Sequence, residues 1–233
     1  MYPGDKTLVF RADDGKVVTA QAWCGPPHEL PLLLGQSMPA KPTPSGSYVI
    51  WGVEPHHTTM KWPFSKIPWG ARLRVDVHDE TDVLWEDRPG HWTSVRRTVG
   101  QSAFGNLTAH NYVIGAERRH FKSGSLDLPS YWHLNDFGPL AVRYFADRNK
   151  NGRKDRNEPL EGSMFHTTPP NEGEDAVYRR EHPGSTEDPP MTMFQSHGCI
   201  HLAPIQLQRM IARGAFIRGT SLTIHTYGEH YSR

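Results

Sequence analysis

The segment of residues 195–202 carries the side chains best suited to covalent chemistry. It reads Gln-Ser-His-Gly-Cys-Ile-His-Leu, so Cys199 directly follows Gly198 and has a histidine two residues away on either side. A cysteine acts as a nucleophile when neighbouring groups lower the pKa of its thiol, and covalent catalysis also needs a base within hydrogen-bond reach. His166, 33 residues upstream, is the candidate base. A buried structural cysteine beside unrelated histidines is the alternative that these eight residues alone leave open.

A glycine directly before the nucleophile has a use of its own. Glycine readily adopts backbone conformations that other residues rarely adopt, so Gly198 permits a tight turn that exposes backbone N–H groups as an oxyanion hole. The other cysteine, Cys24, follows a predicted strand. We expect Cys24 to be a small buried apolar residue and not a disulfide partner of Cys199.

Residues 147–158 form a second motif, which fits the pattern D-x-[DN]-x-[DN]-G-x5-E of a calcium-binding loop. Oxygen ligands would come from Asp147, Asn149, Asn151, Asp155 and Glu158, and from the backbone carbonyl of Arg153. Such ligands suit a structural Ca²⁺ ion. However, Lys154 stands where an apolar residue is usual, and a solvated turn rich in Asn, Asp and Gly has the same composition. A calcium loop and a plain polar turn therefore both stay open.

Short strands must position these residues. Alternating and β-branched runs predict strands over residues 6–11, 16–23, 47–52, 72–78, 111–114, 140–145, 162–166 and 221–226. The first two form a hairpin around a turn at residues 13–15, and His166 lies at the end of a strand. One helix is predicted from Pro204, in its first turn, to Gly214, which is placed to end it. Long loops are predicted over residues 25–47, 53–70 and 169–190.

The composition favours a mainly β domain and excludes several classes of protein. The 233 residues include 21 Gly and 20 Pro, which disfavours a helical bundle and favours many turns. A net charge of +1 argues against a nucleic-acid partner, and no apolar stretch is long enough for a transmembrane segment. Two cysteines exclude a disulfide scaffold. We expect one domain over residues 1–233, with an insertion-rich middle region at about 53–163.

The motif Ser196-His197-Gly198-Cys199 resembles the signature of the L,D-transpeptidase (YkuD-type) catalytic domain. Other segments match that family in the same order: the opening hairpin at residues 8–18, a Thr-Pro-x-Gly turn and strand at 43–50, the strand end that carries the catalytic histidine at 165–168, and the closing strand at 213–224. One departure is His201, which stands where Arg or Asn is usual. The resemblance implies a mainly β fold, a YkuD-like β-sandwich or mixed sheet with one or two short helices and long inserted loops.

The resemblance also implies a reaction on peptidoglycan tetrapeptide stems. Cys199 would attack a stem-peptide carbonyl and release D-Ala, which leaves a thioester on the enzyme. His166 would take the thiol proton, and the backbone carbonyl of Thr167 would orient its imidazole. Backbone N–H groups of Gly198 and Cys199, with His197 lining the site, would hold the oxyanion.

The same resemblance gives the remaining residues of the signature a place at the substrate. Ser196 would fix the loop, and Ser196 and His201 would contact the substrate. No cofactor is required for catalysis in this scheme. A structural Ca²⁺ ion is the one ligand that the sequence adds.

The group that resolves the thioester decides the biological outcome. An amine gives a cross-link or D-amino-acid exchange, and water gives L,D-carboxypeptidase activity. A catalytically idle, calcium-stabilised wall-binding module is the alternative from another class. The expected site of action is the periplasm or cell envelope. No signal peptide is visible, so signal-independent secretion as an antibacterial effector, with secretion machinery and an immunity protein as partners, is one expectation beside a housekeeping envelope enzyme.

Overall fold

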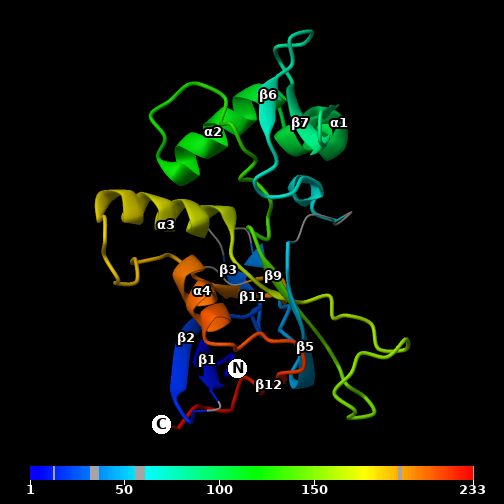
Figure 1. The fold of residues 1–233 in the computed structure, drawn as a ribbon, viewed down its shortest axis with the longest axis vertical. Helices are drawn as coiled ribbons and strands as arrows, with labels where there is room; N and C mark the ends of the chain where they lie inside the picture. Colours follow the sequence, from blue (N-terminus) through cyan, green and yellow to red (C-terminus); the bar gives the residue numbers. More distant parts are fainter. Residues whose placement is uncertain (13, 32–36, 56–60, 194–195, 233) are drawn as a thin grey trace. The chain divides into compact units, whose positions relative to one another are not determined.

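The computed structural model describes residues 1–12, 14–31, 37–55, 61–193 and 196–232. Residue 13 of the predicted hairpin turn and residue 195 of the cysteine segment lie outside this part. The chain forms two compact units (Figure 1). The first comprises Met1–Glu54, Ala141–Thr167 and Pro190–Arg233, and the second comprises Pro55–Leu140 and Thr168–Pro189. Whether they make up the single domain that the sequence predicts stays a prediction.

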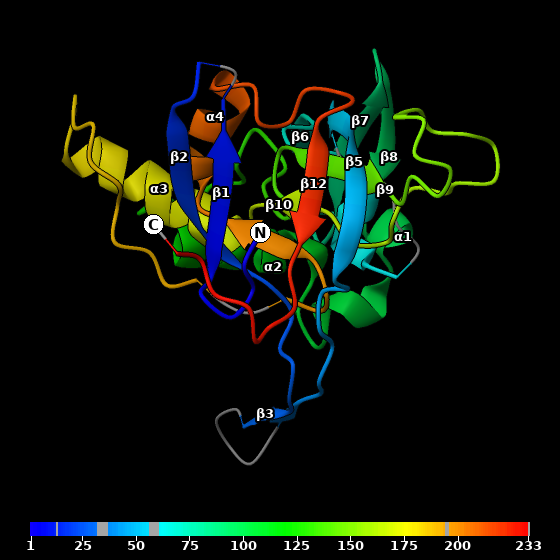
Figure 2. The ribbon, with the colours of Figure 1, turned by 90° about the horizontal axis from the view of Figure 1, so that it is seen from below.

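The first unit is built on a seven-stranded sheet with the strand order β1-β2-β11-β10-β9-β5-β12. The strands are β1 (Thr7–Arg11), β2 (Val17–Trp23), β5 (Gly46–Glu54), β9 (Ala141–Phe145), β10 (Phe165–His166), β11 (Ile200–Leu202) and β12 (Ser221–Ile224). The pair β10–β11 is parallel, and the other pairs of this sheet are antiparallel. The sheet curls, so that its two edge strands β1 and β12 face each other (Figure 2). A mainly β, mixed-sheet fold is thereby confirmed.

Local sequence explains these strands. In β12 the side chains of Leu222 and Ile224 are buried while those of Ser221 and Thr223 are exposed, which is the two-residue period of a strand with one face on a core. The predicted strands of this unit are confirmed, although the strand expected over residues 162–166 is reduced to Phe165–His166. A two-stranded ladder, β3 (Leu30–Pro31) with β4 (Ser37–Met38), lies in the stretch predicted as loop.

The predicted helix is α4, Pro204–Ala212. Pro204 occupies its first turn, where a missing N–H costs no hydrogen bond. Leu207 and Met210 bury one face, and Gly214 follows the helix with a φ of 81° that a side chain would disfavour.

The second unit combines a three-stranded sheet with helices. The sheet consists of β6 (Leu73–Val75), β7 (Val83–Arg88) and β8 (His91–Ser94), and the helices are α1 (Val95–Val99), α2 (Ala109–Phe121) and α3 (Pro169–Glu181), with 3₁₀ turns η2 (Pro63–Lys66) and η3 (Gln101–Phe104). Fully buried Trp132, Ile67 and Val83 lie in its core. Among the described residues, no helix of either unit is long and apolar enough to cross a membrane.

Two predictions for this unit are wrong. Residues 111–114 belong to helix α2 and not to a strand, because Thr108 caps the helix and Ala109, Val113 and Ala116 bury one helical face. The stretch 169–190, predicted as loop, begins with thirteen residues of helix α3.

The prolines of α3 explain the second error. Thr168 accepts a hydrogen bond from the backbone N–H of Asn171, and Pro169 and Pro170 stand in the first turn of the helix. Prolines at that position start a helix instead of breaking it. The described part of the chain has four α-helices, whereas the family resemblance implies one or two short ones.

Candidate active site

The parallel pair β10–β11 brings the sequence-predicted residues together. In the register of these two strands His166 lies opposite His201, and their rings meet edge to face with centroids 4.6 Å apart. Cys199 directly precedes β11. Cys199 and His201 are half-buried while Ile200 between them is buried, and this alternation indicates that Cys199 and His201 project from the same face. In-register neighbours share a face as well, so His166 joins them. Three residues from two distant motifs thus occupy one face of the sheet.

The imidazole of His166 is almost fully buried, with 3% of the residue exposed. Its Nδ1 lies 2.5 Å from the backbone carbonyl oxygen of Thr167. Since a carbonyl oxygen can only accept, Nδ1 carries the ring proton, and Nε2 is the nitrogen with a lone pair for acid–base work. This is the orienting contact that the sequence analysis expects of Thr167.

The signature loop is closed by the hydroxyl of Ser196. Ser196 Oγ accepts a hydrogen bond from the backbone N–H of Gly198 at 3.1 Å and donates one to the carbonyl oxygen of Cys199. Gly198 has a φ of 104°, which explains why glycine stands there. The Gly198 N–H, expected as an oxyanion donor, is therefore used within the loop. His197 is exposed, in contrast to its buried neighbours Ser196 and Gly198.

The two cysteines differ in their surroundings. Both are free thiols, and Cys24 is buried whereas Cys199 is half-buried. Burial raises the pKa of the Cys24 thiol to about 12. A thiol with such a pKa supplies almost no thiolate near neutral pH, which leaves Cys199 as the candidate nucleophile.

Three residues near the site were not identified by sequence reasoning. Trp23 is the register partner of His201 on β2, so it lies on the other side of that histidine from His166. Thr43 and Tyr227 hydrogen-bond to the backbone around the cysteine loop. Only Thr43 had a sequence signal, as the first residue of the Thr-Pro-x-Gly motif, and that motif did not reveal its contact.

The calcium-like loop is closed by its own hydrogen bonds. Asp147 accepts from the backbone N–H groups of Asn151 and Gly152, and the buried carboxylate of Glu158 accepts from those of Arg148 at 2.8 Å and Asp155 at 2.9 Å. Asp155 in turn accepts from the side-chain amides of Asn149 and Asn151, and Asn151 Oδ1 accepts from the backbone N–H of Arg153. Across the described residues, no group of three or more His, Cys, Asp or Glu side chains is placed to hold a metal ion. Calcium binding stays a prediction.

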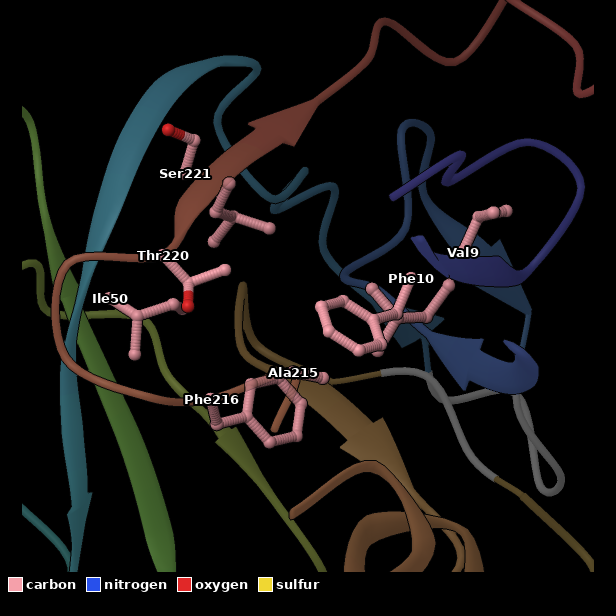
Figure 3. A pocket seen from close by; sticks show the side chains of 9 residues that line it. Val9, Phe10, Ile50, Ala215, Phe216, Thr220 and Ser221 are labelled. Atoms are coloured by element: carbon pink, nitrogen blue, oxygen red, sulfur yellow. The ribbon is translucent and has the colours of Figure 1, made fainter. Parts of the chain in front are cut away.

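A small apolar pocket lies between the facing edge strands β1 and β12 (Figure 3). Phe10, Ile50 and Phe216 contribute its largest side chains. None of the residues assigned to chemistry lines it. The pocket therefore lies where the two edges of the curled sheet face each other, and it is separate from the candidate site.

Comparison with known proteins adds one match. The family model YkuD, described as the L,D-transpeptidase catalytic domain, matches residues 3–218, which include Cys199, His166 and the strands that carry them. No curated protein and no solved structure matches the chain.

Proposed function

Since this chain belongs to the L,D-transpeptidase (YkuD) catalytic-domain family, whose members act on peptidoglycan, we propose that it is a cysteine acyltransferase working on peptidoglycan tetrapeptide stems. The observation that carries the proposal is the shared face of Cys199 and His166, with the Nδ1 of His166 oriented by the Thr167 carbonyl. A nucleophile, a base and a group that orients the base are the parts that acyl transfer requires.

In the first step, the Cys199 thiol transfers its proton to Nε2 of His166, and the sulfur attacks the carbonyl carbon that precedes the terminal D-Ala. A carbon–sulfur bond forms and the carbon–nitrogen bond to D-Ala breaks, while His166 returns the proton to the leaving amine. In the second step, an amine attacks the thioester carbon and His166 takes its proton. The carbon–sulfur bond breaks, and His166 returns the proton to the Cys199 thiolate. General acid–base catalysis of this kind contributes about 10²- to 10⁴-fold to the rate.

The oxyanion needs donors during both steps. The Gly198 N–H donates to Ser196 in the resting loop, so we assign the oxyanion contact to the N–H of Cys199, with the exposed His197 at the edge of the site. Ser196 keeps the loop in shape through its two hydrogen bonds.

We assign His201 to the substrate. Its half-buried ring lies beside that of His166, where the resemblance places an Arg or Asn. An imidazole there can donate to, or accept from, a stem-peptide group. Replacing His201 with Ala should raise KM for muropeptides more than it lowers kcat, and the opposite pattern would place His201 in the chemical steps.

The decisive experiment incubates the full chain with purified tetrapeptide muropeptides and free D-Met. Exchange gives a D-Met-ended stem, cross-linking gives dimers, and hydrolysis gives a tripeptide, so mass spectrometry separates transpeptidation from L,D-carboxypeptidase activity. Cys199→Ala should abolish every product, and Cys24→Ala is the matched control that should retain them. Products from the Cys199→Ala variant would refute the scheme, and an inert wild-type chain that still binds sacculi would support the wall-binding module.

The proposed site of action is the periplasm or cell envelope, because the family acts on the cell wall. In the effector version of the proposal, secretion machinery delivers the protein to a target cell and an immunity protein protects the producer. Directing the chain to the periplasm of a susceptible bacterium tests this version. Growth arrest that Cys199→Ala abolishes would support the effector, and unimpaired growth would favour a housekeeping enzyme.

A further inference from the structure

The carbonyl group of Cys199 is held by a residue from outside the cysteine loop. We infer that Thr43 and Tyr227 are positioning residues, which fix the backbone of the nucleophile through a chain of directed hydrogen bonds. The inference rests on the proposed function in one respect, namely that Cys199 is the nucleophile.

Thr43 makes the direct contact. It is 1% exposed, and its Oγ1 accepts a hydrogen bond from the backbone N–H of Gly25 at 3.0 Å. The same hydroxyl lies 3.3 Å from the carbonyl oxygen of Cys199. The Cys24 thiol also hydrogen-bonds the Thr43 side chain, and its raised pKa keeps it protonated, so it can act as a donor. The N–H of Gly25 can only donate as well, so the one proton of the Thr43 hydroxyl is free to point at the carbonyl oxygen of Cys199.

Tyr227 restrains the backbone of Thr43. Its hydroxyl accepts a hydrogen bond from the backbone N–H of Thr43 at 3.1 Å and donates one to the carbonyl oxygen of Gly25. Burial raises the pKa of Tyr227 above its ordinary value, so the phenol keeps the proton that it donates. Both backbone groups of Gly25 are thus bound to these two hydroxyls.

The backbone at Gly25 packs closely against the cysteine loop. A Cβ atom at Gly25 would lie 2.0 Å from the carbonyl oxygen of Lys41 and 2.7 Å from the backbone nitrogen of Gly198. The backbone N–H of Ser196 lies 3.4 Å from the carbonyl oxygen of Cys24, which it donates to. The segments around residues 25 and 43 therefore pack directly against the cysteine loop and restrict its movement.

The consequence concerns the direction of the nucleophile. The carbonyl oxygen of Cys199 accepts two hydroxyl protons, one from Ser196 and one from Thr43. Two donors fix the peptide plane that follows Cys199, and this restrains the Cα atom from which the side chain with Sγ projects. Displacement of a reacting group by about 1 Å can cost about 100-fold in rate, so loss of this restraint should appear in turnover.

Tyr227 is not explained by the family match. The matched range ends at residue 218, so Tyr227 lies nine residues beyond it. Its contact with Gly25 joins residues 202 positions apart in sequence. The outer half of this positioning chain is therefore a feature of this protein outside the part that its family model describes.

The test compares Thr43→Val, which keeps the shape of the side chain but removes the hydroxyl, with Thr43→Ser, which restores it. Thr223→Val, on the exposed face of β12, is the matched control. We expect Thr43→Val to lower kcat by about 10- to 100-fold with little change in KM, and Thr43→Ser to recover most of the loss. A second readout is the pH profile of Cys199 alkylation by iodoacetamide, followed on the Cys199 peptide by mass spectrometry, which Thr43→Val should alter and Thr223→Val should not.

Tyr227→Phe extends the test to the outer contact and keeps the Thr43 side chain intact if Thr43→Val does not fold. It should lower kcat less than Thr43→Val does, and Tyr231→Phe serves as its control. Unchanged kcat and an unchanged alkylation profile in both Thr43→Val and Tyr227→Phe, with only the melting temperature lowered, would overturn the inference.

Failure of the proposed function would look different. If the wild-type chain does not process muropeptides while Thr43→Val still alters the alkylation profile of Cys199, the positioning role stands and the proposed substrate falls. If wild-type turnover is normal and neither readout moves in the variants, the proposed function stands and the positioning role falls.

Discussion

The imidazole Nδ1 of His166 lies 2.5 Å from the backbone carbonyl oxygen of Thr167, its neighbour in the chain. The acceptor belongs to the backbone, so the side chain at position 167 takes no part in this contact. The orientation of the proposed base, His166, is therefore set by the backbone path with which the chain leaves β10. A substitution at residue 167 that keeps the backbone path should keep the tautomer of His166.

This relationship predicts a sharp contrast between neighbouring positions. His166→Gln should lower kcat/KM for D-Ala release by about 10²- to 10⁴-fold, because the base is lost, whereas Thr167→Ser should stay close to the wild-type rate. His225→Gln is the control, because the half-buried His225 contacts Glu229 and lies outside the proposed site. Wild-type turnover by His166→Gln would show that another group is the base.

The buried thiol of Cys24 predicts a loss of stability at alkaline pH. Burial raises its pKa from 9.0 to about 12, so between these values the unfolded chain loses a proton that the folded chain keeps. The folded pKa is the higher one, so the contribution of this group is intact below pH 9.0 and falls as pH rises, by up to about 1.4 kcal/mol per pH unit. Urea unfolding at pH values on both sides of 9.0 measures this slope.

The matched variants for that measurement are the two cysteine-to-alanine changes. Cys24→Ala should flatten the decline of unfolding free energy above pH 9.0, whereas Cys199→Ala should leave it as in the wild type. Equal slopes in all three proteins would mean that other groups, such as buried tyrosines, cause the alkaline sensitivity.

Local patterns made much of the first unit predictable. The alternation of Leu222 and Ile224 with exposed neighbours marks β12, and Pro204 with Gly214 brackets α4. The cysteine loop could also be predicted, because the hydrogen bonds of Ser196 that close it reach only to Gly198 and Cys199. In each case the interaction that decides the structure lies within a few residues in sequence.

The rest depends on contacts that no local pattern shows. Thr43 and Tyr227 meet across 184 residues through a backbone N–H, and any residue type other than proline supplies such a group. Helices α2 and α3 carry polar and charged residues and bury only narrow faces against each other, so their sequences resemble loops. The local sequence signals for the starts of these two helices are the capping residues Thr108 and Thr168.

The loop at residues 147–158 gives a prediction on stability and calcium. Glu158 is 1% exposed and accepts from the backbone N–H groups of Arg148 and Asp155. Glu158→Gln puts an amide NH₂ against one of these donors, so it should destabilise the fold by about 1–3 kcal/mol in urea unfolding, and Glu187→Gln, at an exposed position, should not. If the loop binds Ca²⁺, the ion should raise the melting temperature of the wild type and not of Glu158→Gln; no heat in calorimetry would remove the calcium site.

The packing of α3 on α2 predicts opposite effects for two glycine-to-alanine changes. Alanine favours a helix over glycine by about 1 kcal/mol, so Gly115→Ala in α2, where a Cβ meets nothing within 4 Å, should stabilise the protein by about that amount. At Gly173 in α3 the added Cβ would lie 2.2 Å from the carbonyl oxygen of His120. That atom belongs to the backbone of α2 and cannot move without displacing the helix, so the steric cost exceeds the gain in helix propensity. Gly173→Ala should therefore lose about 1–3 kcal/mol in unfolding followed by circular dichroism, and stabilisation by both changes would show that α3 does not pack on α2 in solution.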